Sequence, residues 1–253
     1  MQVSKDCMTC FFCDTNVRKD KNTAAWGNRG RFALKLAFVL SSVWMHHASL
    51  AYFNTADNTA EGGTLYSNSE GEGGTPLNPT QRALSMACSV MFAGRICLQM
   101  FVLWDRVTSW TEVLAEAGVC IPGALLSLGF TQPHSPPLRL YLSFLVFLAG
   151  TGLNVASEVQ RHLFKRRASN KGKLFVTGLF SVCRHPNYTG EILSFIGFAG
   201  VSGVAWNLWI PLAMGTCMVQ WSVPELQFYL RQRYGVQWEK YAARVTWNVF
   251  PGC

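Results

Sequence analysis

The chain has 253 residues, of which 49% are hydrophobic and only 14% are charged. Soluble domains usually carry about a quarter charged residues, so this composition, with several apolar runs of spanning length, excludes an ordinary soluble enzyme and predicts an integral membrane protein. The formal net charge is +8, but the basic residues cluster beside apolar segments. We therefore expect a membrane as the partner and no nucleic acid.

The N-terminal third predicts a tail, one membrane span and a loop. Residues 1–31 are polar and basic, with no apolar core of signal-peptide length, so we expect a cytoplasmic tail before a retained signal anchor. The first span is Phe32–Phe53. Residues 54–80 are rich in Gly, Asn, Ser and Thr and lack Lys and Arg, which predicts a lumenal or outer loop. Residues 32–80 thus form the first span and its polar loop.

Nine cysteines are an odd number, and several lie inside apolar runs, so no disulfide framework is expected. Two residues separate Cys7 from Cys10, and two more separate Cys10 from Cys13, which is a metal-ligand spacing. No second ligand pair follows nearby. We therefore expect a reduced tail and predict no metal.

Five more apolar segments give about six spans in all and predict an all-α, polytopic membrane helix bundle over residues 81–253. These segments are Ala83–Trp104, Glu112–Phe130, Leu138–Ala156, Ile192–Ser202 and Trp206–Val223. Ile192–Ser202 is short for a crossing, so it either begins earlier, near Asn187, or forms a tight hairpin with the following segment.

Arg95 lies in the middle of the second span. A guanidinium at that depth needs an acceptor. The acceptor is either a helix-end carbonyl or an anionic group of a ligand, and purely structural pairing is equally open.

Charge predicts the orientation of the bundle. Between Ala156 and Glu191 there are seven basic residues and one acid, Glu158, so this connector faces the cytoplasm. The tail from Glu225 to Cys253 alternates charged and aromatic residues, which predicts a cytoplasmic amphipathic helix that caps the bundle. We expect a multi-pass protein of the endoplasmic reticulum.

Two pairs of polar residues predict a binding site. Asn154 and Glu158 are four residues apart at the inner end of one span, and Asn187 and Glu191 repeat that spacing before the next apolar run. Two amides and two carboxylates at one depth can converge on one polar ligand, since carboxylates accept ribose hydroxyls and Asn matches an amide such as nicotinamide. The alternative is helix capping together with snorkelling cations.

Residues beside these pairs supply further chemistry. Basic side chains of the connector could take phosphates: Arg161, Arg166, Arg167, Lys171 and Lys173. His185 precedes Pro186, which predicts a turn before the helix, and next to Arg184 it could bind an anion or donate a proton. Tyr188 could donate a proton to a carbonyl oxygen. The chain has no Gly-rich nucleotide fingerprint and no Walker-type loop.

Three runs carry a family resemblance: Asn170-Lys-Gly-Lys173, Thr177-Gly-Leu-Phe180 and Arg184-His-Pro-Asn-Tyr188-x-Gly190-Glu191. Together they resemble the steroid 5α-reductase C-terminal domain family. The ending Arg233-Tyr-Gly235-x2-Trp238-x2-Tyr241, with Pro251-Gly252, is similar to the C-termini of sterol C14-reductases. Isoprenylcysteine and phospholipid methyltransferases share a shorter version, Arg-His-Pro-x-Tyr-x-Gly, followed by a later Glu.

The reductase resemblance implies that residues 81–253 form a membrane domain that binds NADPH and reduces an activated carbon–carbon double bond of a lipid or steroid-like substrate from the bilayer. It implies that Tyr188 and His185 are catalytic. The residues that it implies for cofactor binding are Asn154, Glu158, Arg161, Lys173, Arg184, Asn187 and Glu191. The chain departs from steroid reductases before Phe228, where Pro224-Glu225-Leu226-Gln227 stands in place of a His cluster.

Two other functions stay open. One is a methyltransferase that binds S-adenosylmethionine with His185, Tyr188 and Glu225. The other is a non-catalytic sterol-binding membrane protein that kept the bundle without turnover. Glu191 directly after Gly190, and the Asn154 and Glu158 pair, favour the reductase.

Overall fold

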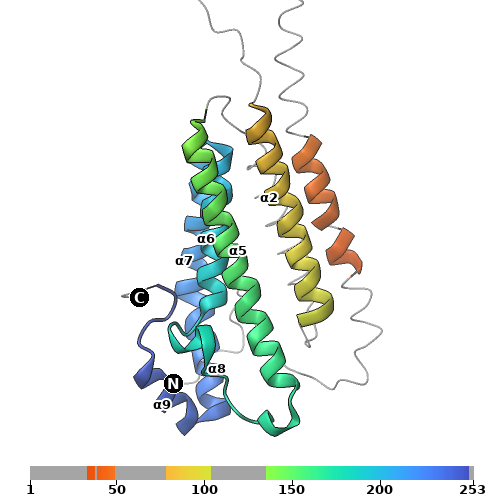
Figure 1. The fold of residues 1–253 in the computed structure, drawn as a ribbon. Coiled ribbons are helices and arrows are strands. Elements are labelled where there is room, and N and C mark those ends of the chain that lie inside the picture. Colours follow the sequence, from red (N-terminus) through yellow and green to blue (C-terminus); the bar gives the residue numbers. More distant parts are fainter. Residues whose placement is uncertain (1–32, 38, 49–77, 104–134, 251–253) are drawn as a thin grey trace, which may run out of the picture.

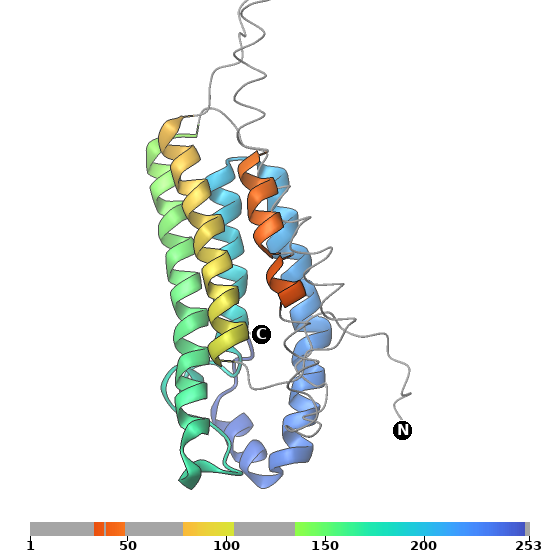
Figure 2. The same cartoon turned by 90° about the vertical axis from the view of Figure 1, so that its right-hand side faces the viewer.

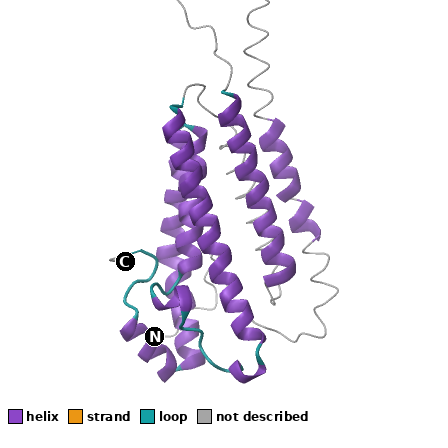
Figure 3. Ribbon diagram, in the orientation of Figure 1, coloured by secondary structure: helices purple, strands orange, loops and turns teal. Residues whose placement is uncertain are grey.

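The computed structural model describes residues 33–37, 39–48, 78–103 and 135–250 (Figure 1). All regular structure in these ranges is helical, without a strand (Figure 3), which confirms the all-α prediction for this part of the chain. The predictions for the third span, for the loop up to residue 77 and for the three N-terminal cysteines lie outside the described residues.

Long helices run side by side along one axis (Figures 1 and 2). Their bounds are α2 (Pro79–Leu98), which continues as the π-helical turn η1 (Gln99–Leu103), α5 (Pro137–Arg166), α6 (Pro186–Ser202), and α7 (Trp209–Cys217), which continues through the π-helical turn η6 (Met218–Ser222) into α8 (Val223–Tyr234). The short elements are the 3-10 turns η3 (Ala168–Asn170), η4 (Gly178–Ser181) and η5 (Ala205–Leu208), and the helix α9 (Val236–Arg244). The connector at 167–185 and α9 share one end of the bundle, which we name the basic end.

Within the described ranges, two helical stretches are long and apolar enough to cross a membrane: Pro79–Leu103 and Pro137–Arg166. Within each stretch an 18-residue window reaches a mean hydropathy of 1.7 and 1.6, respectively. This agrees with a membrane helical protein, while the number of crossings stays a prediction. The helix α5 continues well past Ala156, where we expected it to end, because Glu158 pairs with Arg161 one turn on and the last turn carries Lys165 and Arg166, cations that suit a helix C-terminus.

Proline marks where the long helices begin. Pro79, Pro137 and Pro186 stand at the first turn of α2, α5 and α6, where a missing N–H costs nothing. The short apolar segment predicted at Ile192–Ser202 therefore belongs to a helix that begins at Pro186, close to the earlier start expected near Asn187. It ends at Gly203, which has a left-handed φ of 79°, and then folds back through η5 onto α7.

The segment 33–48 packs on α2 through its histidine pair. His46 Nε2 lies 3.1 Å from Ser85 Oγ, and His47 Nε2 lies 2.9 Å from Ser89 Oγ. The ring of His46 also meets Phe198 of α6 edge-on at 5.4 Å. The two imidazoles therefore bridge this segment to its neighbours.

The closest contact in the described bundle joins α5 and α6 backbone to backbone. A Cβ atom on Gly190 would lie 2.5 Å from the Asn154 amide nitrogen, and one on Gly197 would lie 2.6 Å from the Cα of Phe147. A Cβ atom on Gly150 would meet the carbonyl oxygen of Gly190 at 2.7 Å. Real Cβ atoms do not approach backbone this closely, so only glycine fits these three positions.

The C-terminal tail differs from the single amphipathic helix that we predicted. The helix α8 continues directly from η6 (Figure 2), and the chain then breaks at Gly235, whose φ of 49° is left-handed. A separate helix, α9, follows and packs Trp238 and Tyr241 against Leu174 and neighbouring apolar residues. The glycine allows the sharp change of direction that makes two helices from one polar, aromatic stretch.

The glycine contact gives the first test. Replacing Gly190 with Ala should destabilise the protein by about 1–3 kcal/mol, because the added methyl group overpacks against backbone that cannot rotate away. Thermal unfolding in detergent, followed by tryptophan fluorescence, should show a Tm lower by roughly 5 °C. The matched control is Gly152→Ala on α5, where a Cβ meets nothing within 4 Å. Equal Tm values for the two variants would contradict the close packing.

Candidate functional site

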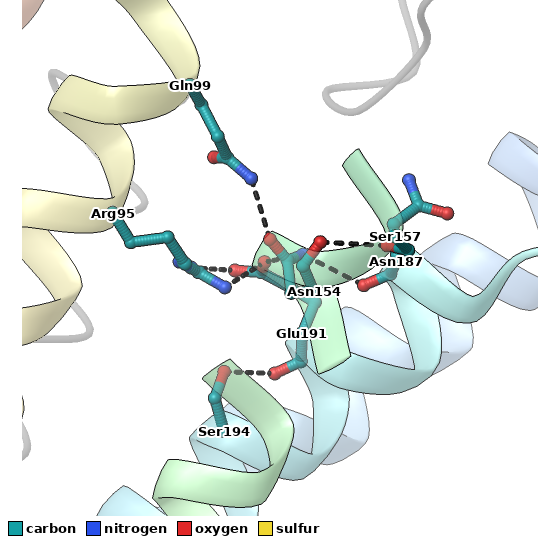
Figure 4. A network of polar contacts seen from close by, with 7 residues as sticks. All are labelled: Arg95, Gln99, Asn154, Ser157, Asn187, Glu191 and Ser194. Atoms are coloured by element: carbon teal, nitrogen blue, oxygen red, sulfur yellow. Dashed lines mark hydrogen bonds and ion pairs between the residues drawn. The ribbon is translucent and has the colours of Figure 1, made fainter. Parts of the chain in front are cut away.

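A buried ion pair joins the last turn of α2 to the N-terminal part of α6 (Figure 4). Arg95 Nη1 donates to Glu191 Oε2 at 2.5 Å, and Nη2 donates to Oε1 at 2.6 Å, so the pair is bidentate. The side chain of Arg95 is 1% exposed and that of Glu191 is 15% exposed. The acceptor that Arg95 needs is therefore a carboxylate of the protein, which we had not named. A pair this deep is stable only with good geometry.

Asn154 connects this pair to two further elements. Its Oδ1 accepts from Gln99 Nε2 at 2.7 Å, and its Nδ2 donates both to the Asn187 carbonyl oxygen at 2.9 Å and to Glu191 Oε2 at 3.0 Å. One amide thus holds α2, α5 and α6 in register (Figure 4). Ser157 donates to the Asn154 carbonyl oxygen at 2.8 Å.

The structure brings the side chains of Asn154 and Glu191 together, and Asn187 joins them through its backbone carbonyl oxygen. Glu158 lies one turn below Asn154 on α5, where it is buried and accepts from Arg161 at 2.6 Å. Their use in cofactor binding stays a prediction.

Two groups in this network keep capacity for a ligand. A carboxylate has about four acceptor positions, and Glu191 fills three of them with Arg95 and Asn154. The side-chain amide of Asn187 is turned away from the ion pair (Figure 4) and makes no hydrogen bond to a described residue. The Asn187 amide therefore has more hydrogen-bonding capacity left for a ligand than the Glu191 carboxylate, whose main partner is Arg95.

Arg184, which the resemblance implied for cofactor binding, holds the C-terminal segment, and its use by a cofactor stays a prediction. Its Nε donates to the Val245 carbonyl at 2.6 Å, Nη2 to the Ala242 carbonyl at 2.8 Å, and Nη1 to Asn248 Oδ1 at 2.9 Å. These acceptors lie at the end of α9 and just beyond it. The guanidinium therefore ties the C-terminal segment to the start of α6, and a phosphate would have to compete with three good acceptors.

The neighbours of Arg184 hold the same segment. The backbone amide of His185 donates to the Asn248 carbonyl at 2.9 Å, and Cys183 Sγ donates to that oxygen at 2.9 Å. Thr189 Oγ1 donates to the Val249 carbonyl. Lys173, the other cation of the predicted site in this connector, is exposed and lies beside Leu174, whose amide donates to Gln237 of α9. Lys173 is therefore not part of the buried network.

His185 and Tyr188 form a separate cluster at the N-terminus of α6. Both are buried, and their rings stack at 5.4 Å with an angle of 16°. Burial, followed by the charges of Arg184 and Arg161, lowers the pKa of His185 to about 3, so the imidazole is neutral at physiological pH. Its Nε2 has no hydrogen-bond partner among the described residues. A buried ring nitrogen without a partner is uncommon and marks a place where a ligand could bind.

A family model described as "Protein of unknown function (DUF1295)" matches residues 112–245, more than half of the chain. The chain belongs to this family. It is also similar to the Delta(14)-sterol reductase of Arabidopsis thaliana, with 23% identity over 192 residues that make up 66% of this chain and 52% of that protein. The predicted relationship to sterol C14-reductases is thereby confirmed.

Two methyltransferases are similar over shorter stretches. The protein-S-isoprenylcysteine O-methyltransferase B of Arabidopsis thaliana is 30% identical over 108 residues, which are 40% of this chain and 52% of that protein. The probable O-methyltransferase ustE of Ustilaginoidea virens is 41% identical over 64 residues, which are 25% of this chain and 22% of that protein. The DUF1295 chain therefore spans about half the length, or less, of these curated relatives.

Sequence reasoning singled out Arg95 but missed Gln99, which also belongs to the network. Gln99, the first residue of η1, stands four residues after Arg95 of α2, which is the same spacing that identified the other pairs. The π-helical turn that begins at Gln99 was also not predicted. Such turns are frequent at functional sites. The spacing of Arg95 and Gln99, compared with that of the two Asn-x3-Glu pairs, would have indicated that α2 and η1 also present a polar face to the network.

The ion pair gives the second test. Arg95→Met should lower the free energy of unfolding by about 3–5 kcal/mol, because it leaves the Glu191 carboxylate buried without its partner. The double variant Arg95→Met with Glu191→Met should lose less than the sum of the two single variants, since neither charge is then unpaired. Thermal unfolding in detergent measures all three. Additive losses would show that the two side chains do not interact.

The pKa of His185 gives the third test. Between pH 6.5 and pH 3 the unfolded chain binds a proton at this residue and the folded chain does not, so stability falls as the pH falls through this window. From pH 6.5 to pH 5, the wild type should lose about 1–2 kcal/mol relative to His185→Gln, which does not titrate. Tm values across this range measure the difference. A constant difference between the two proteins would mean that His185 titrates normally.

Proposed function

We propose that this DUF1295 protein is a membrane oxidoreductase that uses NADPH to reduce an activated carbon–carbon double bond of a lipid or steroid-like substrate, in a multi-pass arrangement in the endoplasmic reticulum. The observation that carries the proposal is the meeting of Asn154, Asn187 and Glu191 beside a basic connector. The similarity to a Delta(14)-sterol reductase over 66% of the chain supports the same reaction class.

The side chains around this network fit a dinucleotide in chemical type. The free amide of Asn187 can pair with a carboxamide, and Glu158 is a buried carboxylate of the kind that accepts ribose hydroxyls. Arg161, paired with Glu158 but partly exposed, is the cation nearest to that carboxylate and suits a phosphate. Exposed cations at the end of α5 and in the connector extend the positive surface: Lys165, Arg166, Arg167, Lys171 and Lys173.

NADPH, when bound, supplies a hydride for one carbon of the double bond, and the other carbon then needs a proton. Tyr188 is the favoured proton donor, because a phenol O–H can donate a proton and the residue lies in the first turn of α6, next in the chain to Asn187. With a pKa of about 3, the imidazole of His185 is unprotonated at neutral pH and carries no extra proton to donate. Its stacked ring instead holds the Tyr188 ring in place, and its open Nε2 offers a hydrogen bond to substrate or cofactor.

A second candidate function is methyl transfer from S-adenosylmethionine. It is favoured by the similarity to two O-methyltransferases, one of them at 41% identity over 64 residues. His185 and Tyr188 would serve this site too, with Glu225 of α8. Glu225 is exposed in the first turn of α8. The buried Asn154 and Glu191 network has no assigned task in this reaction, which is why the reductase is preferred.

Cofactor preference gives the fourth test. NADPH should raise the Tm of the purified protein in detergent, because a ligand that binds only the folded state stabilises it by mass action. S-adenosylmethionine should leave the Tm unchanged. The reverse preference would replace the reductase with the methyltransferase, and no response to either compound would favour a non-catalytic sterol-binding protein.

A variant locates the site in the same assay. Asn187→Ala should weaken NADPH binding by about tenfold, which is what the loss of one or two well-placed hydrogen bonds costs. It should leave the Tm of the free protein unchanged, since the side-chain amide holds no described residue. Gln232→Ala, an exposed amide on α8, is the matched control. Equal affinities of the two variants would remove Asn187 from the site.

A further inference from the structure

A groove of about 560 Å³ runs along the outer face of α6 and α7. This volume is within the range of small-molecule sites. Its lining residues come from α6, η5, α7, η6 and the C-terminal segment: Ile192, Ile196, Leu208, Pro211, Leu212, Gly215, Thr216, Val219, Gln220 and Phe250. From Leu208 to Gln220 the groove follows about twelve helical residues, or roughly 18 Å.

Polar groups in this groove gather at one end. Thr216 uses its hydroxyl within the helix, donating to the Leu212 carbonyl at 2.8 Å. Gln220 is the remaining polar side chain of the lining, and it is exposed at the end nearer to the basic end of the bundle. The wall toward Leu208 is entirely apolar. This gradient, apolar along the helices and polar at one end, matches a lipid better than a protein helix.

Glycine opens the middle of the groove. A Cβ atom on Gly215 would lie 3.4 Å from Ile192 Cδ1, which is ordinary van der Waals contact. A methyl group therefore fits there, and any longer side chain would extend into the space between α6 and α7. The width of the groove at this point depends on the missing side chain.

The polar end of the groove adjoins the candidate proton donor. Ile192, Val219 and Phe250 line the groove and also pack in one apolar cluster with Tyr188, which lies one turn before Ile192 on α6. The next helical face, through Asn187 and Glu191, carries the polar network. A molecule lying along the groove with its polar end toward the basic end thus contacts side chains that pack in one cluster with Tyr188.

We propose that this groove binds the extended apolar chain of the lipid substrate, with the reacting end of the molecule directed to Tyr188. The proposal rests on the reductase function for the identity of the substrate, but it assigns a site and a chemical class that the polar network does not. Continuity with Tyr188 and the one-ended polarity select a lipid chain. A dimer contact with a second copy of the protein would require neither the continuity with Tyr188 nor the polarity at one end.

Photolabelling tests the groove directly. The full chain in detergent is irradiated with palmitic acid that carries a diazirine, and the labelled peptides are identified by mass spectrometry. We expect labels on residues 192–196 and 212–220 that an excess of unlabelled palmitic acid removes. Gly215→Leu should reduce this labelling about tenfold, because the leucine fills the groove. Gly152→Leu adds the same side chain at an open position of α5 and should change nothing.

The outcomes separate this proposal from the proposed function. Labels spread evenly over the outer faces of α5 and α7, or unchanged labelling in Gly215→Leu, would overturn the groove as a site. A cross-link between two copies of the chain through these residues would overturn it in favour of a dimer interface. NADPH should stabilise Gly215→Leu as it does the wild type. Groove labelling without any NADPH response would keep the lipid site and reject the reductase.

Discussion

The arrangement of the bundle depends on backbone contact between α5 and α6. Gly150, Gly190 and Gly197 remove the side chains that would keep the two helices apart. Because the helices touch, the Asn154 amide reaches across to the Asn187 carbonyl and to Glu191 without any intervening group. A separation of one more methyl group would stretch these hydrogen bonds beyond their range. The polar network therefore depends on the three glycines, because they allow the two helices to approach closely enough for its hydrogen bonds to form.

The ion pair with α2 then closes the network. Arg95 and Gln99 present their donors from successive turns of α2 and η1, and both meet acceptors held by α5 and α6. Removing one member of such a network leaves buried polar groups without partners, which costs more than the bond itself contributes. The network consequently defines which faces of three helices meet. It also leaves one amide, that of Asn187, turned outward and available.

The sequence predicted those parts of the structure that follow from local chemistry. The apolar runs indicated helices, Pro186 indicated the turn before α6, and the two Asn-x3-Glu pairs indicated polar side chains at one depth. Long-range choices were not predictable. Nothing in the sequence near Arg95 identifies Glu191, which is 96 residues away, as its partner. Nothing near Arg184 in the sequence identifies its three acceptors either, because they lie in the C-terminal segment about 60 residues away.

The central claim is that this network forms one side of a dinucleotide site. A crystal structure of the protein grown from a lipid phase with NADPH tests it most directly. The account predicts the nicotinamide amide within hydrogen-bonding distance of the Asn187 side chain, with the Arg95 and Glu191 pair intact behind it. Well-ordered α5 and α6 with the nicotinamide bound elsewhere, or with no dinucleotide at millimolar NADPH, would contradict it.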